Sequence, residues 1–435
     1  MPFCLLTERW LPVRRRSGTM SLIAPSEITS AEPDPAVALL WPRPDFRLAS
    51  LEFLIGLLAT ACPPGDMDDW IDFYQEPPTA AALADAFAPF AAAFVLDGDG
   101  PRFLQDLEDF ASDANPVAGL LIDAPGANAV KRNTDLMVKR GHVEVLSRAA
   151  AAMALYTLQS YAPAGGAGNR TSLRGGGPLT TLVIPPGAGQ EPSLWHILWS
   201  NVPLGQALKP ADMAQALPWL APTRMSDKGG RTTPADAHPL QVWWGMPRRI
   251  RLDVKGAEAI CDLTGERDST TVRSWRQRPW GANYLLWEHP LSPYYRPKPN
   301  DALLPMHPQP GGIGYQHWLG LLTRRSQPLR QVARTVMEFR DRVKVVHPGQ
   351  QWRLLAAGYD MDNMKARGFA ESEMPVTEPH NLADAAAHDV LLAALVEAAN
   401  LTGGLLARCV RRALFGDGAS IAVDAALLAS LRERF

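Results

Sequence analysis

A chain of 435 residues is long enough to bury a large core, and its length suggests two or three domains. Acidic residues number 45 and basic residues 43, so the overall charge does not mark a nucleic-acid binder and any such surface must be local. Cys4, Cys62, Cys261 and Cys409 lack paired spacing. This argues against a zinc or disulfide framework and predicts buried thiols in a reducing compartment.

The N-terminal residues lack the basic, apolar and small-residue succession of a signal peptide. No apolar run reaches the roughly 18 residues that a membrane span needs. We therefore expect a cytoplasmic protein with no membrane partner.

Prolines and glycines, 39 and 34 in number, break the chain into short elements and favour a mixed fold. A first core helix is predicted to begin near Ser50, where Leu51, Leu54, Ile55 and Leu58 recur at helical spacing after a Pro-Asp start signal. A second helix is predicted over residues 143–161, which are rich in alanine and end before a proline.

Short β-branched or aromatic runs follow, bounded by proline or glycine. Strands are predicted at LTTLVIP (179–185), VWWGM (242–246) and IRLDV (250–254). From about Asn381 the pattern becomes helical, with an interruption at Gly403 and Gly404. The prediction is an α+β fold with a large mixed N-terminal domain of many short strands and loops, followed by a helical C-terminal module.

Two loops have unusual compositions. Residues 162–177, APAGGAGNRTSLRGGG, allow the backbone to approach a ligand closely, yet they lack the Lys-Ser/Thr of a phosphate-binding loop and the strand-to-helix context of a dinucleotide fingerprint. A flexible loop, a nucleic-acid contact and a nucleotide pocket all remain open. In residues 126–142, basic residues lie on both sides of an Asn-Thr-Asp core. This segment could hold RNA or form a solvated connection.

Further basic residues could converge on a phosphate-tracking surface. They are Arg248, Arg249, Arg251, Arg273, Arg276, Arg278, Arg324, Arg325, Arg330, Arg334, Arg340, Arg342 and Lys344. Neighbouring tryptophans such as Trp243, Trp244 and Trp275 are expected in the core. No catalytic motif or close metal-ligand cluster stands out, so no enzyme activity, metal or cofactor is predicted.

Several blocks, in order, resemble one family. They are LLTERWLPVRRR, WPRPDFRLASLEFLIGLLATACPP, the Asn-Thr-Asp loop, SLRGGGPLTTLV, WGMPRRIRL and GYDMDNMKARGF, distributed from Leu5 to about Arg367. Together they resemble CasA, the large subunit of the type I-E CRISPR Cascade complex of antiviral defence. The resemblance implies a non-catalytic subunit that reads the protospacer-adjacent motif of double-stranded target DNA, while guide RNA reads sequence by base pairing in the R-loop.

The resemblance also implies roles for residues. The family's glycine loop, which presses against the motif in the minor groove, falls on Gly165, Gly166, Ala167 and Gly168. Its basic finger matches Arg276, Gln277 and Arg278, with arginine in place of lysine. Its strand-separating wedge matches Asp362 and Asn363, where a shorter amide replaces glutamine. Asn133, Thr134, Asp135 and Met137 match the loop that docks on the guide RNA 5′ end and on other Cascade subunits.

The family ends in a four-helix bundle, and in this sequence that bundle is expected to be shortened. We therefore predict residues 1–375 as the DNA-reading and docking domain and 376–435 as a truncated helical module. Recruitment of a helicase-nuclease would be a further family function. Two alternatives are a nucleotide-dependent enzyme that uses the glycine loop and a purely architectural subunit.

Overall fold

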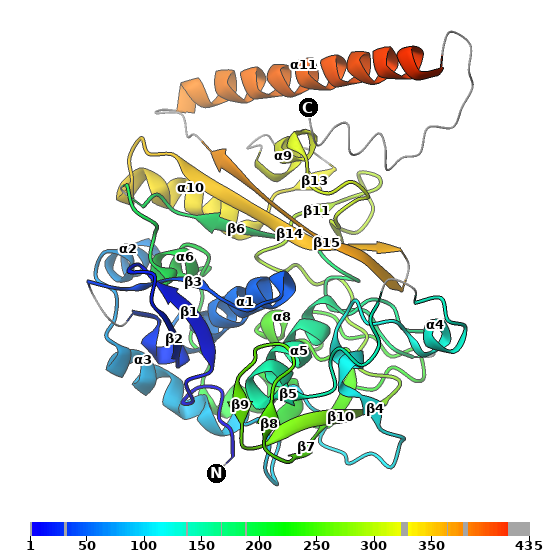
Figure 1. Cartoon of the computed structure of the whole chain (residues 1–435). Helices are drawn as coiled ribbons and strands as arrows, with labels where there is room; N and C mark the ends of the chain where they lie inside the picture. The colour runs from blue at the N-terminus through cyan, green and yellow to red at the C-terminus, as the bar shows by residue number, and fades with distance from the viewer. Residues whose placement is uncertain are drawn as a thin grey trace.

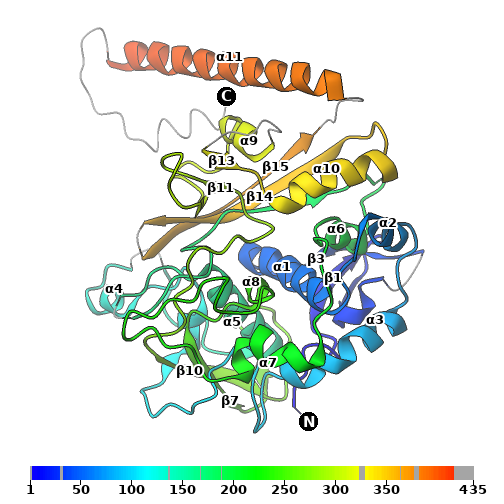
Figure 2. The same ribbon diagram turned by 180° about the vertical axis from the view of Figure 1, so that it is seen from behind.

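The computed structural model describes residues 2–29, 33–135, 138–166, 168–187, 189–322, 329–362, 364–376 and 382–415. Figures 1 and 2 show short helices and small sheets packed into one body, with a long helix along its top edge. The α-helices are α1 Pro44–Ala61, α2 Met67–Gln75, α3 Ala80–Phe87, α4 Ala127–Lys131, α5 Arg148–Tyr161, α6 Leu194–Ser200, α7 Met213–Ala216, α8 Gln241–Trp244, α9 Tyr315–Leu322, α10 Arg334–Val346 and α11 Leu382–Phe415. The strands are β1 Leu11–Arg15, β2 Met20–Ile23, β3 Ala36–Leu39, β4 Asn115–Pro116, β5 Leu146–Ser147, β6 Thr180–Ile184, β7 Arg249–Gly256, β8 Ala259–Ile260, β9 Arg267–Asp268, β10 Thr271–Arg278, β11 Tyr294–Tyr295, β12 Leu304–Pro305, β13 Arg330–Gln331, β14 Trp352–Asp362 and β15 Lys365–Val376. These many short elements confirm the predicted α+β class.

Helix α1 is central to the core. It begins at Pro44, earlier than expected, because proline suits the first helical turn and Asp45 lies near the positive end of the helix dipole. Phe53 makes edge-to-face contacts, with ring centroids 5.6–6.2 Å apart, to Trp10, Phe94, Phe103, Tyr156 and Trp244. Each such pair contributes about 0.5–1.5 kcal/mol beyond burial of its area. This single helix therefore ties together segments from the first 250 residues.

Two sheets determine where the loops of interest lie. Strand β10 pairs antiparallel with β7 and with the short strands β4 and β5. The β14–β15 hairpin pairs through β14 with β6, and Ala357 lies opposite Thr180. Because β6 directly follows the glycine-rich segment 162–177, this pairing carries the hairpin to the base of that segment.

The predicted helix over residues 143–161 is confirmed as α5, although it begins later, after β5. The predicted strands around 180–184 and 250–254 are confirmed as β6 and β7. The strand predicted at residues 242–246 is wrong, because residues there form α8. Trp243 packs against Gly56 of α1, and the Trp244 indole donates to Thr60 Oγ1 at 2.9 Å. Consecutive buried indoles on one helix satisfy the same apolar pattern that suggested a strand.

Helix α11 continues through Gly403 and Gly404, so the predicted interruption is wrong. It lies beside α9 (Figures 1 and 2), and its apolar side chains Val390, Leu391, Leu395, Leu401, Leu405 and Leu406 are exposed. By length and composition, Ala387–Ala413 is long and apolar enough to cross a membrane, so the expectation that no segment meets this criterion is wrong. One such helix is weak evidence for a membrane span. The prediction of buried thiols is confirmed for Cys261, but Cys4 and Cys62 are half-buried and Cys409 is exposed on α11.

Candidate nucleic-acid interface

The glycine loop is a tight turn that projects from the end of α5. Gly165 N–H donates to Asn169 O at 3.2 Å, and Asn169 N–H donates to Gly166 O at 2.7 Å. Gly166 and Gly168 have φ of 64° and 81°, a region that glycine enters without the steric cost other residues incur. Ala167 lies outside the described residues.

The three glycines differ in what surrounds them. A Cβ on Gly165 would lie 2.5 Å from Asn169 Cβ and 2.7 Å from Arg248 Nη1, and one on Gly168 would lie 2.7 Å from Trp280 Cδ2. A Cβ on Gly166 would meet no atom within 4 Å. Gly165 and Gly168 are therefore required by the protein's own packing, whereas Gly166 presents its backbone to open space.

A network from two distant segments holds this turn. Trp280 N–H donates to Gly168 O at 2.8 Å, and the Arg170 guanidinium lies 5.1 Å from the Trp280 ring centroid. Arg170 also donates to Ser226 Oγ at 2.9 Å, and Ser226 Oγ donates to Gly281 O at 2.7 Å. Sequence reasoning missed Arg170, Ser226 and Trp280. The Pro-Trp-Gly turn signal after β10 was the available clue.

Arg248 lies directly beneath the glycine loop. Its side chain is buried, its Nη2 donates to Pro163 O, and its Nε has no hydrogen-bond partner. Burial lowers the pKa of Arg248 to about 10, which leaves it protonated at neutral pH. The loop therefore rests on a buried positive charge.

The second glycine triplet has a different environment. Arg174, which precedes it, is 3% exposed and forms a 2.6 Å ion pair with Glu52 of α1. Burial alone would lower the pKa of Arg174, but the Glu52 carboxylate raises it above its ordinary value. Arg174 is thus an internal anchor for the loop and not a surface cation.

The basic-finger residues Arg276, Gln277 and Arg278 lie on β10 opposite β7. Arg276 lies 3.5 Å from Asp253 Oδ1, and Arg278 lies 3.2 Å from Glu108 Oε2. Both guanidinium groups therefore have carboxylates nearby. The loop that contacts Gly168 begins immediately after Arg278, so β10 connects this finger with the glycine loop.

Of the two wedge residues, Asp362 ends β14, lies opposite Lys365 of β15 and is exposed. Asn363 lies outside the described residues. A Cβ built on Gly177 would lie 2.8 Å from Met361 Cγ, and one on Gly176 would lie 3.0 Å from Pro163 Cα. The base of the glycine loop and the end of the hairpin therefore pack together, as one interface requires.

The predicted docking loop follows α4 and is largely exposed. Arg140 donates to Asp135 Oδ1 at 2.6 Å and to Asn133 Oδ1 at 2.9 Å, while Thr134 N–H donates to Ala129 O at 2.9 Å. The hydrogen bonds from Arg140 hold the pKa of Asp135 below its usual range. Met137 lies outside the described residues.

The wider set of basic residues does not form one free surface. Arg249 pairs with Asp106 at 2.6 Å, Arg251 pairs with Asp109 at 2.7 Å, and Arg342 is buried against Glu338. Arg324 and Arg325 lie outside the described residues. The suggestion that these cations could converge on a phosphate-tracking surface therefore fails for Arg249, Arg251 and Arg342, because carboxylates within the fold neutralise them. Trp243, Trp244 and Trp275 are buried, as predicted.

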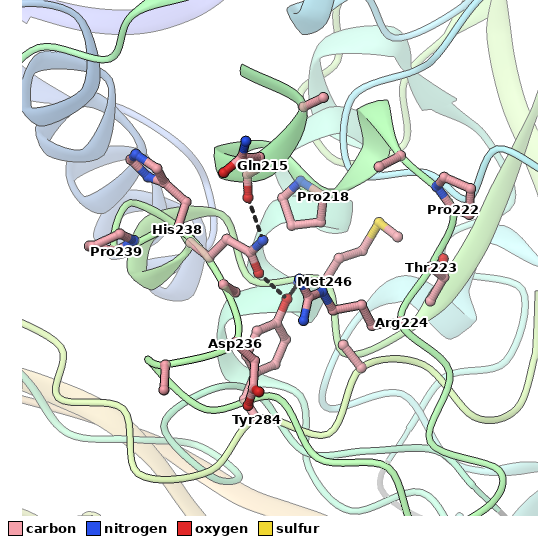
Figure 3. Close-up of a pocket in the computed structure, with 16 residues that line it drawn as sticks. Gln215, Pro218, Pro222, Thr223, Arg224, Asp236, His238, Pro239, Met246 and Tyr284 are labelled. Carbon is pink, nitrogen blue, oxygen red and sulfur yellow. Dashed lines mark hydrogen bonds between the residues drawn. The ribbon is translucent and has the colours of Figure 1, made fainter. Parts of the chain in front are cut away.

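A cavity of about 630 Å³ lies between the segments around α7, α8 and Tyr284 (Figure 3). Its polar groups bond to one another: Gln241 Nε2 donates to Gln215 O at 2.7 Å, and Tyr284 Oη donates to Gln241 Oε1 at 3.3 Å. No described glycine-loop residue lines it. Across the described ranges, no group of three or more His, Cys, Asp or Glu residues is arranged to hold a metal ion.

Comparison with known proteins gives a consistent result. The family described as CRISPR-associated protein Cse1 matches residues 5–435. The fold is similar to Thermus thermophilus CasA (Cse1), with a TM-score of 0.71, 20% identity, and 95% of this chain and 83% of that chain covered. For Cse1 from Acidimicrobium ferrooxidans the TM-score is 0.69 and the identity 18%, with 100% of this chain and 84% of that chain covered. For a chain of a CRISPR RNA-guided surveillance complex the TM-score is 0.67 and the identity 16%, with 95% of this chain and 83% of that chain covered.

Proposed function

This chain belongs to the CRISPR-associated Cse1 (CasA) family, and from that premise we propose that it is the large subunit of a type I-E Cascade complex. In this role it recognises the protospacer-adjacent motif on double-stranded DNA and promotes strand separation and R-loop formation without catalysing a reaction. The observation that carries the proposal is the open backbone of Gly166, held at φ 64° on a loop whose other glycines are packed.

Such a loop suits the minor groove. Its peptide groups can approach base edges closely because Gly166 has no side chain. The minor groove distinguishes mainly A·T from G·C pairs, so contact by backbone would accept several related motifs. The buried Arg248 beneath the loop adds a positive potential that favours a polyanion.

Strand separation is assigned to the β14–β15 hairpin. The end of β14 packs near the base of the glycine loop, so Asp362 would lie next to the first base pair beyond the motif. Asn363 is proposed to share this role because it follows Asp362 in the sequence. Duplex stacking costs about 1.4 kcal/mol per step, and a polar tip inserted there would offset part of that cost. The finger residues Arg276, Gln277 and Arg278 would support the duplex from β10.

The docking loop is assigned to the guide RNA 5′ end and to other Cascade subunits. The likeness to a chain from an RNA-guided surveillance complex supports this setting. Hydrogen bonds from Arg140 hold Asn133 and Asp135 in place before docking. The proposal includes a cytoplasmic location and a helicase-nuclease as a further partner.

The nucleotide-dependent alternative receives less support. The glycine loop is stabilised by Trp280 and Arg248 and does not line the cavity of Figure 3. A purely architectural subunit would need no backbone open to solvent at Gly166. Addition of ATP or GTP should leave the thermal midpoint of the protein unchanged, and stabilisation would favour the enzyme.

The decisive experiment uses Gly166→Asn in the assembled complex with guide RNA. Asparagine tolerates positive φ, so the turn should persist while a side chain blocks the groove. We expect motif-bearing duplex to bind about 10–100-fold more weakly, since direct base contacts contribute about 1–3 kcal/mol. Gly265→Asn is the matched control, because Gly265 has φ 72° and equally open surroundings. Equal affinity of both variants for motif-bearing DNA would refute motif reading by this loop.

A further inference from the structure

A second exposed glycine tip lies beside the glycine loop. Residues 227–231, Asp-Lys-Gly-Gly-Arg, are all exposed. Gly229 has φ 76° and open surroundings, while a Cβ on Gly230 would lie 2.8 Å from Met225 O. We name this segment the basic tip.

Both ends of the basic tip are fixed to the segment that holds the glycine loop. On one side Ser226 N–H donates to Trp280 O at 3.2 Å, and Trp280 N–H donates to Gly168 O at 2.8 Å. On the other side Thr232 N–H donates to Asn283 O at 2.8 Å, and the Trp287 indole donates to Thr232 O at 2.9 Å. The tip and the glycine loop are therefore both hydrogen-bonded to the same short segment.

The charges of the tip face solvent. Lys228 and Arg231 are exposed, and no carboxylate lies within ion-pair distance of either among the described residues. The Asp227 carboxylate accepts a hydrogen bond from the Lys228 backbone N–H at 3.1 Å. The two side chains remain available to an external anion.

Arg248 provides an independent sign of an anionic ligand. It is 9% exposed, its Nε has no partner, and its Nη1 lies against Gly165. A buried cation is costly unless an opposite charge lies near it. An anion lying across the glycine loop and the basic tip would compensate it.

We propose that the basic tip binds the sugar-phosphate backbone of the target duplex next to the motif, through Lys228, Arg231 and the open backbone of Gly229. Phosphate contacts of this kind position a duplex and carry no sequence information. The inference rests on the proposed function, because it needs the duplex to lie on the glycine loop. The tip sets affinity and orientation, whereas the glycine loop sets motif preference.

The test compares Lys228→Ala/Arg231→Ala with the unaltered chain in the assembled complex, by equilibrium binding of motif-bearing and motif-free duplexes between about 50 and 200 mM salt. We expect the slope of the logarithm of the association constant against the logarithm of the salt concentration to become smaller in magnitude by about 0.9 for each lost phosphate contact, or about 1.8 for both. Binding of both duplexes should weaken by the same factor. Lys228→Arg/Arg231→Lys should retain the original slope.

Lys209→Ala/Lys255→Ala is the control for charge alone, since both lysines are exposed and Lys255 lies at the end of β7 remote from Arg249. An unchanged slope in the tip variant, or an equal change in the control, would overturn the inference. Release of the subunit from the complex would also overturn it, because the tip would then contact RNA or protein. Failure of the proposed function differs from all of these: the unaltered complex would bind motif-bearing and motif-free duplexes equally.

Discussion

The buried ion pair between Glu52 and Arg174 leads to a prediction about stability. Glu52 is 1% exposed; its Oε2 accepts from Arg174 Nη2 at 2.6 Å and its Oε1 accepts from Thr180 Oγ1 at 2.5 Å. Glu52→Ala would leave the Arg174 cation buried without its carboxylate, which costs about 3–5 kcal/mol. Because the free energy of unfolding of a domain is about 5–15 kcal/mol, this single change should remove a large fraction of its stability.

Urea unfolding followed by tryptophan fluorescence measures this effect. Glu52→Gln removes the carboxylate charge but keeps an acceptor oxygen for Arg174, so it should cost less than Glu52→Ala by about 1.5–3 kcal/mol, the value of the retained hydrogen bond to a charged group. Glu371→Ala is the control, because Glu371 and Arg47 are each 42% exposed and 3.5 Å apart, and such surface pairs contribute about 0–1 kcal/mol. If Glu52→Ala costs no more than Glu371→Ala, the pair is not an anchor of the loop and the reasoning fails.

Two further predictions concern the docking loop and the hairpin tip. Asn133→Ala/Asp135→Ala removes the two side-chain acceptors of Arg140 and leaves only its bond to Val130 O, so the subunit should separate from the guide-RNA complex in size-exclusion chromatography while motif discrimination persists. Full retention of the subunit would contradict docking by this loop. Asp362→Ala/Asn363→Ala should slow R-loop formation on linear duplex, and the effect should be smaller on negatively supercoiled DNA. A pre-melted bubble beside an intact motif should restore the rate. Equal slowness on bubble and duplex would show that this tip does not separate the strands.

Local patterns predicted several elements well. Helix α1 has apolar residues at helical spacing and a proline start, and β6 and β7 are β-branched runs between breakers. The pattern at α8 was ambiguous, because two adjacent tryptophans can be buried either by a short helix or by a strand buried on both faces. Packing against α1 decides the outcome, and that packing is not encoded in the local residues.

The glycine loop was visible in the sequence, but the separate roles of its glycines were not. Gly165 and Gly168 are constrained by Arg248 and Trp280, which lie more than 80 residues away along the chain. The arginines posed the same problem. Arg174 and Arg249 look like surface cations in the sequence, and only their long-range contacts to Glu52 and Asp106 make them structural.

A loop that reads DNA through its backbone must be rigid, because a mobile loop would lose conformational entropy on binding. Here the rigidity comes from side chains outside the loop: Trp280 holds Gly168, and Arg248 bonds to Pro163. Gly166, the proposed reading position, can then lack a side chain while its neighbours Gly165 and Gly168 are held by packing. Substitutions at Gly168 or Trp280 should therefore impair binding by disturbing the support, whereas substitution at Gly166 obstructs the contact itself. For that reason Gly166→Asn, and not a change at Gly168, separates motif reading from loop stability.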